Sequence, residues 1–240
     1  QVLGPTHPDT ARSLNNLGGL LQAMGELAAA RPLYERALAI REQVLGPTHP
    51  DTAHSLNNLG ALLQAMGELA AARPYYERAL AIYEQVLGPT HPDTARSLNN
   101  LGALLDAQGD LAAARPLYER ALDIREQVLG PTHPDTALSL NNLGGLLQAM
   151  GELAAARPYY ERALDIREQV LGPTHPATAT SLWWMGIILR DEENLQQAAH
   201  YLRRAVHGFV TTLGSAHPHT QGAQRDLAVV EERLAGETSP

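Results

Sequence analysis

Apolar residues recur along the chain with the spacing of amphipathic helices, in two kinds of segment that alternate. In the first kind, four apolar residues follow one another at intervals of three and four: Leu14, Leu17, Leu21 and Met24. Such intervals place the side chains on one face of a helix. The second kind carries a similar but longer stripe. We therefore expect one helix over about residues 7–24 and another over about residues 27–45.

Cap and turn residues fix the expected ends of these helices. Thr6 is placed to cap the first helix, with Asp9 reaching back to it, and Pro8 stands where its missing N–H costs little. Gly25 is expected in the left-handed conformation that ends many helices. The Gly-Pro pair at 46–47 ends the second helix.

The second helix has two further features. Pro32 lies near its start, where we expect a bend or a late beginning. The pairs Glu35/Arg36 and Arg41/Glu42 recur in later copies. They predict a solvated outer face with partners one helical turn apart.

The two segments recur as a unit with a period of 42 residues. LGPTHP begins at Leu3, Leu45, Leu87, Leu129 and Leu171, and LGSAHP begins at Leu213. One hairpin cannot bury both apolar stripes, whereas stacked copies can, so this period predicts an all-α solenoid of antiparallel helix pairs. We expect one domain over 1–240. Its copies are 3–44, 45–86, 87–128, 129–170 and the diverged 171–212, followed by a capping helix over 213–235 and a tail over 236–240.

The two ends of the array differ. The last copy contains one helix, and its QRDLAVVEERLAGE is polar on more of its circumference than earlier first helices, which indicates a terminal lid. No such lid precedes the first copy. Residues 1–2 match the end of a second helix, as at 43–44, so we expect a further repeat or domain before Gln1.

Composition excludes several classes of partner. The chain of 240 residues has a net charge of −8 and no run of Lys or Arg, which argues against nucleic acid or an anionic membrane. No apolar run approaches the roughly 20 residues that span a bilayer. Cysteine is absent, so disulfides and thiolate metal sites are excluded. No signal peptide is visible, and a cytoplasmic location is the working expectation.

Several segments resemble the tetratricopeptide repeat, which is usually about 34 residues long. ARPLYERALAIREQVLG, HPDTA and LNNLG carry the resemblance through residues at the motif's spacing: Leu14, Asn16, Leu17, Gly18, Leu21, Gly25, Ala30, Tyr34 and Ala37. The second helix is longer than usual, as in kinesin light chain repeats and similar bacterial and fungal arrays. Some of those arrays follow a signalling NTPase domain. The resemblance covers residues 3 to about 212 and, more weakly, to 235.

The resemblance implies a right-handed superhelix whose first helices line a concave face. It also implies that an extended peptide binds in that concave groove. The groove positions of the family correspond here to Arg12, Asn15, Asn16, Gly19, Gln22 and Ala23. The family brings no catalytic residue.

The repeated SLNNLG places two amides in each copy. One row is Asn15, Asn57, Asn99 and Asn141, and the other is Asn16, Asn58, Asn100 and Asn142. Because asparagine both donates and accepts, either row suits a peptide backbone, and Gly or Ala neighbours would admit it closely. The alternative is that the amides bond neighbouring copies and fix their register. We favour an open groove for the Asn15 row and leave both interpretations open for the Asn16 row, which is nearer the repeat interface in the family.

Groove positions that vary are candidates for specificity. The position of Arg12 and Arg96 also holds His, Leu and Thr, and the position of Gln22, Gln64 and Gln148 also holds Asp and Arg. The fifth copy replaces the two asparagines by Trp183 and Trp184. They either form an aromatic anchor or pack against the final helix, which we favour. Trp183 is the better groove candidate and Trp184 the better core candidate.

The remaining motifs favour a binding module over an enzyme. Six histidines recur in HP pairs, and we interpret them as part of the helix-start turn, because stacked copies hold them too far apart for one metal ion. No catalytic motif occurs. We expect no enzymatic activity, no cofactor and no metal, and a protein or peptide partner. The alternative is a spacer or an array that self-associates head to tail through its exposed N-terminal face.

Overall fold

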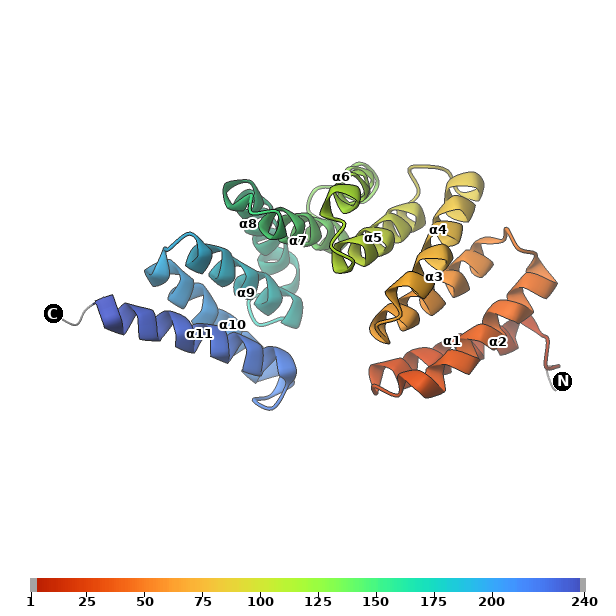
Figure 1. Cartoon of the computed structure of the whole chain (residues 1–240), viewed down its shortest axis with the longest axis horizontal. Coiled ribbons are helices and arrows are strands. Elements are labelled where there is room, and N and C mark those ends of the chain that lie inside the picture. The colour runs from red at the N-terminus through yellow and green to blue at the C-terminus, as the bar shows by residue number, and fades with distance from the viewer. Residues whose placement is uncertain (1–3, 238–240) are drawn as a thin grey trace. The chain divides into compact units, whose positions relative to one another are not determined.

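The computed structural model describes residues 4–237, and every regular element in that range is an α-helix (Figure 1). The chain divides into two compact units, Gln1–Ile124 and Arg125–Pro240. Both units consist of helices packed in consecutive pairs, so the predicted all-α fold of stacked helix pairs is confirmed. A single domain over 1–240 stays a prediction.

Odd-numbered helices are the first helices of the copies and even-numbered helices are the second. The first unit contains α1 (Pro8–Ala23), α2 (Leu27–Leu45), α3 (Pro50–Ala65), α4 (Leu69–Val86), α5 (Pro92–Ala107) and most of α6 (Leu111–Val128). The second contains the end of α6 and α7 (Pro134–Ala149), α8 (Leu153–Leu171), α9 (Pro176–Asp191), α10 (Leu195–Leu213) and α11 (Pro218–Glu237). Inside each unit a helix packs on the one before it and the one after it.

The first helix of each copy begins after a histidine. The His7 Nδ1 accepts the backbone N–H of Asp9 at 3.2 Å, and Pro8 occupies the first helical position. The same cap recurs at His49, His91, His133 and His175. The prediction that Thr6 is the cap is therefore wrong by one residue, because the imidazole reaches the first N–H that follows the proline. The interpretation of the HP pairs as helix-start turns is confirmed.

The predicted helix ends are confirmed. Gly25 has a φ of +81°, and the N–H groups of Gly25 and Glu26 donate to the carbonyls of Gln22 and Leu21 at 3.0 and 2.9 Å. This is the double bond pattern of a Schellman motif. α2 begins at Leu27 with Pro32 inside it, so the late start expected there is wrong.

A tyrosine of the second helix packs on a glycine of the first in each of the first four copies. A Cβ added to Gly18 would lie 3.1 Å from the Tyr34 ring, and one added to Gly102 would lie 2.9 Å from the Tyr118 ring. A Cβ at either position would force the tyrosine ring or the helix to move, so the close approach of the two helices depends on a glycine here. The glycine of SLNNLG is thus explained by packing within the copy.

The final helix, α11, packs on α10 and has a polar outer face. Where earlier first helices bury Ala, Leu, Gly and Leu against their own second helix, α11 exposes Gln221, Gln224, Ala228 and Glu231. This agrees with the expected lid. α11 continues to Glu237, two residues into the predicted tail, and residues 238–240 lie outside the described part.

The fifth copy holds a non-glycine residue in the left-handed turn after its first helix. Glu193 has a φ of +63°, where the preceding copy has Gly151. A side chain in this region costs roughly 1–2 kcal/mol. We expect Glu193→Gly to raise the free energy of unfolding by about 1 kcal/mol, measured by urea denaturation. Glu193→Ala is the control, since it removes the ion pair with Arg233 but keeps the Cβ, and equal stability of the two variants would contradict the strain.

Candidate functional site

The Asn15 row is buried between copies. Asn15, Asn57, Asn99 and Asn141 are 4 to 8% exposed. The Nδ2 of Asn15 donates to Ser55 Oγ of the next copy at 3.1 Å, and Asn141 donates to Ser181 Oγ at 3.1 Å. Asn57 and Ser97 exchange two hydrogen bonds of 2.9 and 3.1 Å. The expectation that this row opens into a groove is wrong, because all four side chains are buried and Asn15, Asn57 and Asn141 bond to the next first helix.

Buried arginines complete these contacts. Arg41 is 7% exposed, and its Nη1 donates to Ser55 Oγ at 2.9 Å and to the carbonyl of Asp51 at 2.8 Å. Arg125 and Arg167 make the same pair of bonds in later copies. Burial lowers the pKa of Arg167 to about 10, so it is still charged at neutral pH. The placement of Arg41 on a solvated outer face is wrong. Its head group reaches the next copy's helix start instead.

The Asn16 row is the more accessible one. Asn16 is exposed, and Asn58, Asn100 and Asn142 are half-buried. The Nδ2 of Asn58 lies 3.5 Å from Asn15 Oδ1, a long contact. We define the open row as Arg12, Asn16, Gly19 and Ala23 with their equivalents in the other copies. These residues follow one another along one stripe of the first helix.

The predicted glutamines are partly occupied by the fold. Tyr34, Tyr76 and Tyr160 donate their hydroxyls to the Oε1 atoms of Gln22, Gln64 and Gln148 at 3.0 to 3.2 Å. Burial raises the pKa of Tyr76 to about 12, so this hydroxyl keeps its proton at neutral pH. The glutamines therefore hold the helix pair together. The amide nitrogens of Gln64 and Gln148 also reach the next copy, where they donate to the carbonyl of Ala103 at 3.5 Å and to Asp191 Oδ2 at 2.8 Å.

Arg12 and Arg96 lie at the start of the open row and are exposed. Each guanidinium pairs with the aspartate one turn earlier, Arg12 with Asp9 at 2.8 Å and Arg96 with Asp93 at 2.9 Å. These exposed pairs contribute little stability, so either arginine can exchange its partner for a ligand carboxylate.

The favoured prediction that the tryptophans pack against the final helix agrees with the position of Trp183, but the finer assignment of the two residues to groove and core is reversed. Trp183 is half-buried, donates Nε1–H to Asp226 Oδ2 of α11 at 2.7 Å and packs on Gly222. It lies at the Asn15 position and anchors the lid, so its assignment to the groove is wrong. Trp184 is 37% exposed and stacks on Tyr160 with ring centroids 6.2 Å apart. Its assignment to the core is wrong, because it lies at the Asn16 position.

The open row of the second unit exposes two large apolar side chains, which we did not predict. Leu138 is 42% exposed at the Arg12 position of α7, and Trp184 is 37% exposed on α9. Ile187, one turn beyond Trp184, is half-buried. One sign of this apolar surface was present in the sequence at the Arg12 position, where Arg and His of the earlier copies change to Leu138.

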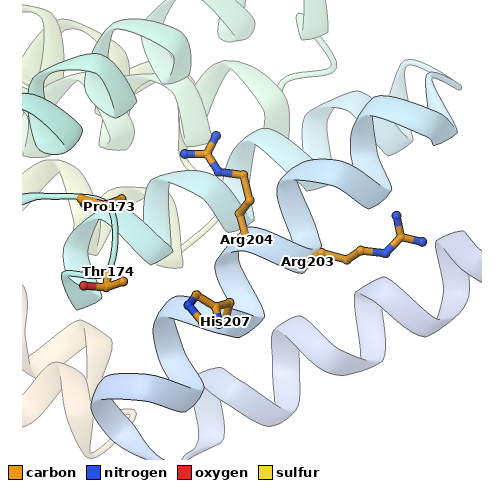
Figure 2. A pocket seen from close by; sticks show the side chains of 5 residues that line it. All are labelled: Pro173, Thr174, Arg203, Arg204 and His207. Atoms are coloured by element: carbon orange, nitrogen blue, oxygen red, sulfur yellow. The ribbon is translucent and has the colours of Figure 1, made fainter.

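Hollows on the second helices lie away from the open row. Figure 2 shows one of about 370 Å³ lined by Pro173, Thr174, Arg203, Arg204 and His207. Arg203 pairs with Glu231 at 2.7 Å, and Arg204 pairs with Glu168. Both cations are thus already neutralised, and the hollow offers no unpaired arginine.

His54 lies at the Arg12 position of α3, and its surroundings make stability depend on pH. Burial and then the charges of Arg41 and Arg96 lower its pKa below 6.5, outweighing Asp51 and Asp93. The folded state therefore binds this proton less readily than the unfolded chain. Its contribution is complete above about pH 6.5 and is lost as the pH falls below that value.

We expect the free energy of unfolding of the first unit to fall less between pH 6.5 and pH 5 in His54→Leu than in the unchanged protein. The fourth copy already has Leu138 at this position, beside the buried Arg125, so leucine fits. Urea titrations of both proteins between pH 7.5 and 5 measure the difference. An identical pH dependence of the two proteins would show that His54 is not the group responsible.

No group of metal-ligating side chains occurs within the described residues. Among those residues no helix is long and apolar enough to cross a membrane.

The structure belongs to the class of helical repeat proteins. Its helix pairs are joined by buried asparagine side chains, while a second row of asparagines stays accessible. Models of the tetratricopeptide repeat match residues 9–85, 55–127, 107–169 and 135–208, and the chain belongs to that family. Repeats of this family generally serve as protein-interaction or scaffold modules.

Solved structures give the same class. A Podospora anserina protein described as a kinesin light chain with nearly identical repeats is 26% identical, with a TM-score of 0.70 over 86% of this chain and 98% of its own. BtubC (BKLC) of P. vanneervenii is 26% identical, with a TM-score of 0.74 over 88% and 84%. The 20% identical PilF of Pseudomonas aeruginosa shares the fold, with a TM-score of 0.61 over 96% and 92%. A search of curated protein sequences found no match.

Proposed function

We propose that the chain binds an extended segment of another protein along the open row of its first helices. The proposal rests on one observation: the two asparagine rows differ in burial and in their hydrogen-bond partners. The Asn15 row is sealed by bonds to the next copy, whereas the Asn16 row retains exposed or half-exposed amides beside small residues. Asn58 makes only a long contact with the preceding copy, so its amide keeps hydrogen-bonding capacity for a ligand.

The chemistry of this row suits a peptide backbone. Each asparagine offers a donor and an acceptor, and Gly19, Ala61 and Ala103 leave room beside the amides of the first unit. Neighbouring first helices lie roughly 8–10 Å apart, and an extended chain advances roughly 3.3 Å per residue. One copy then matches about three residues of peptide.

The second unit adds side-chain selectivity. Leu138 and Trp184 expose apolar surface on its open row, and tryptophan is enriched among residues that dominate binding energy. A segment bound at this unit would present an aliphatic or aromatic side chain. Arg12 and Arg96 in the first unit favour a carboxylate.

The test begins with peptides selected from a random library displayed on phage. The affinity of one selected peptide is then measured by fluorescence anisotropy against three proteins. In the first, Asn16, Asn58 and Asn100 are changed to alanine. We expect binding at least ten-fold weaker, because three hydrogen bonds of about 0.5–1.5 kcal/mol each are lost.

The second protein carries Trp184→Ala, and we expect a similar loss, through the apolar contact, for a peptide that binds the second unit. The third is the control Gln196→Ala, which removes an exposed amide from α10, away from the open row. Unfolding curves establish that each variant is folded. Unchanged affinity in both row variants, or an equal loss in the control, would refute the binding role of the open row.

One observation favours a structural role instead. Leu17 and Leu20 are exposed on α1, as a self-associating array would require. The polar outer face of α11 counts against a head-to-tail contact between copies of this chain. Light scattering over a range of concentrations separates the two, since the peptide-binding module is expected to stay monomeric. A cytoplasmic location and an association with an NTPase domain stay predictions.

A further inference from the structure

The residue at the Arg12 position of the open row varies in step with a buried residue of the preceding second helix. That buried residue stands at the Arg41 position, 13 residues earlier in the chain. In chain order the five pairs are Arg41 with His54, Tyr83 with Arg96, Arg125 with Leu138, Arg167 with Thr180 and Phe209 with Gly222. Among these pairs, a permanent cation stands on the open row only where the buried residue is a tyrosine.

The contact between Arg41 and His54 shows why a buried arginine disfavours a cation beside it. Arg41 is buried and forms no ion pair with any described residue, and its Nη1 donates to Ser55 Oγ and to the carbonyl of Asp51. The same Nη1 lies 3.3 Å from His54 Nδ1. Because a guanidinium only donates, this imidazole nitrogen must be unprotonated to accept the bond. After burial, the charge of Arg41 is the next cause that lowers the pKa of His54.

At the contact between Tyr83 and Arg96 the buried residue is neutral. Tyr83 is 2% exposed, and burial raises its pKa, so its hydroxyl keeps the proton at neutral pH. The Nη2 of Arg96 donates to Tyr83 Oη at 3.4 Å and pairs with Asp93 at 2.9 Å. A phenol oxygen can accept from a guanidinium, whereas a second guanidinium cannot. Both contacts use Nη2, so the remaining N–H groups of this exposed side chain can bind a carboxylate.

The remaining pairs follow the same pattern. Arg125 and Arg167 donate to a serine hydroxyl and a carbonyl of the next copy, as Arg41 does, and the residues paired with them are uncharged. A guanidinium at the position of Leu138 would place two cations at one partly buried site, where like charges repel strongly. At the last pair the side chain is excluded by space, since a Cβ on Gly222 would lie 2.6 Å from the ring of Trp183.

We propose that Tyr83 determines where along the open row an acidic side chain of the partner binds. Tyr83 permits Arg96 on α5, whereas Arg41, Arg125 and Arg167 exclude a permanent cation from the same position of α3, α7 and α9. The inference rests on the proposed function, because it requires a segment bound along the open row. Tyr83 is a positioning residue, since it touches Arg96 and not the ligand.

A double-mutant cycle in the first unit tests the exclusion without a ligand. Tyr83→Arg together with Arg96→Leu recreates the pair that Arg125 and Leu138 form in the same chain. We expect Tyr83→Arg to raise the equilibrium constant of unfolding about ten-fold or more when Arg96 is present, and about three-fold or less when it is combined with Arg96→Leu. Urea denaturation of the four proteins measures both values. An equal effect in the two backgrounds would overturn the exclusion.

The reciprocal change repeats this test in the second unit. Leu138→Arg places a cation beside the buried Arg125, and we expect it to raise the equilibrium constant of unfolding about ten-fold. Adding Arg125→Tyr supplies the neutral residue that Arg96 has, and it should recover most of the loss. If Arg125→Tyr made the Leu138→Arg protein less stable, the exclusion would be refuted in this unit as well.

Binding is measured with an acidic peptide selected from a random phage library, and with the same peptide after its Asp and Glu are changed to Asn and Gln. We expect the unchanged protein to bind the acidic peptide about ten-fold more tightly than the neutral one, and the Arg96→Leu protein to bind the two within about two-fold of each other. Arg73→Leu is the matched control, because it removes an exposed arginine of α4 that pairs with Glu77, away from the open row. It should leave the ratio unchanged.

Tyr83→Phe tests the positioning role, because it removes only the hydroxyl that accepts from Arg96. We expect the ratio between the two peptides to fall about two- to three-fold, whereas a purely structural role would change stability and leave the ratio unaltered. A preference for the acidic peptide that survives Arg96→Leu would overturn the proposal and leave binding along the open row intact. Failure of the proposed function would appear differently, as an affinity that does not depend on the Asn16 row.

Discussion

Trp183→Ala is expected to lower the free energy of unfolding of the second unit by about 3 kcal/mol and to release α11. The indole lies against Gly222, where an added Cβ would come within 2.6 Å of the ring, and it forms an edge contact with Phe209. It also donates to Asp226, which accepts from Arg190 at 3.1 Å as well. Truncating a large buried aromatic costs about 3–5 kcal/mol, and we take the lower end because Trp183 is half-buried.

Hydrogen exchange measures the release of α11, and urea denaturation measures the stability. Trp184→Ala is the matched control, because it removes the same side chain from the exposed neighbouring position and should cost about 1 kcal/mol or less. Trp183→Phe should fall between the two, since it keeps much of the ring contact and loses the bond to Asp226. If Trp184→Ala proved the more harmful variant, our assignment of the two tryptophans would be reversed.

The sequence was sufficient for the fold because the fold depends on local signals that repeat. The 42-residue period, the apolar stripes and the glycines after each helix predicted the bounds of the first helix pair to within one residue, whereas the capping helix begins five residues later than predicted. Each of these signals acts within a few residues of chain. Agreement among several copies then removes most of the ambiguity of a single one.

The site was harder to predict because adjacent residues on a helix differ by only about 100° in direction. Asn15 and Asn16 are identical in type and both flank the apolar stripe. Which one faces the next copy is decided by where that copy packs, and this depends on contacts such as Ser55 and Arg41 from other helices. Those residues are distant in sequence and carry no local signal for this role.

The same cause explains the two tryptophans. Trp183 stands at the Asn15 position and Trp184 at the Asn16 position. Because the Asn15 position was wrongly assigned to the groove, Trp183 was wrongly assigned to it as well, and Trp184 was wrongly assigned to the core. In retrospect Ala223 is a clue, because it stands where earlier copies have the serine that accepts a hydrogen bond from the asparagine side chain. Loss of the serine together with loss of the asparagine indicates that the Asn15 position faces the next helix.

Asn57→Ala is expected to lower the free energy of unfolding of the first unit by about 1–3 kcal/mol, while Asn58→Ala should change it by about 0.5 kcal/mol or less. Asn57 exchanges two hydrogen bonds with Ser97, which is fully buried. Removing the amide leaves that hydroxyl without this partner, and an unsatisfied buried group accounts for most of the cost. Asn58 is half-exposed, so water can replace its contacts.

A double-mutant cycle with Ser97→Ala makes the test specific to this pair. Removing both polar groups should cost less than the sum of the single changes, because no orphaned partner remains. The chain already uses such a double replacement, with Trp183 and Ala223 at the corresponding positions. Equal costs for Asn57→Ala and Asn58→Ala would mean that both rows fix register. In that case the Asn16 row would be as important for packing as the Asn15 row, and the argument that it is available for binding a peptide would fail.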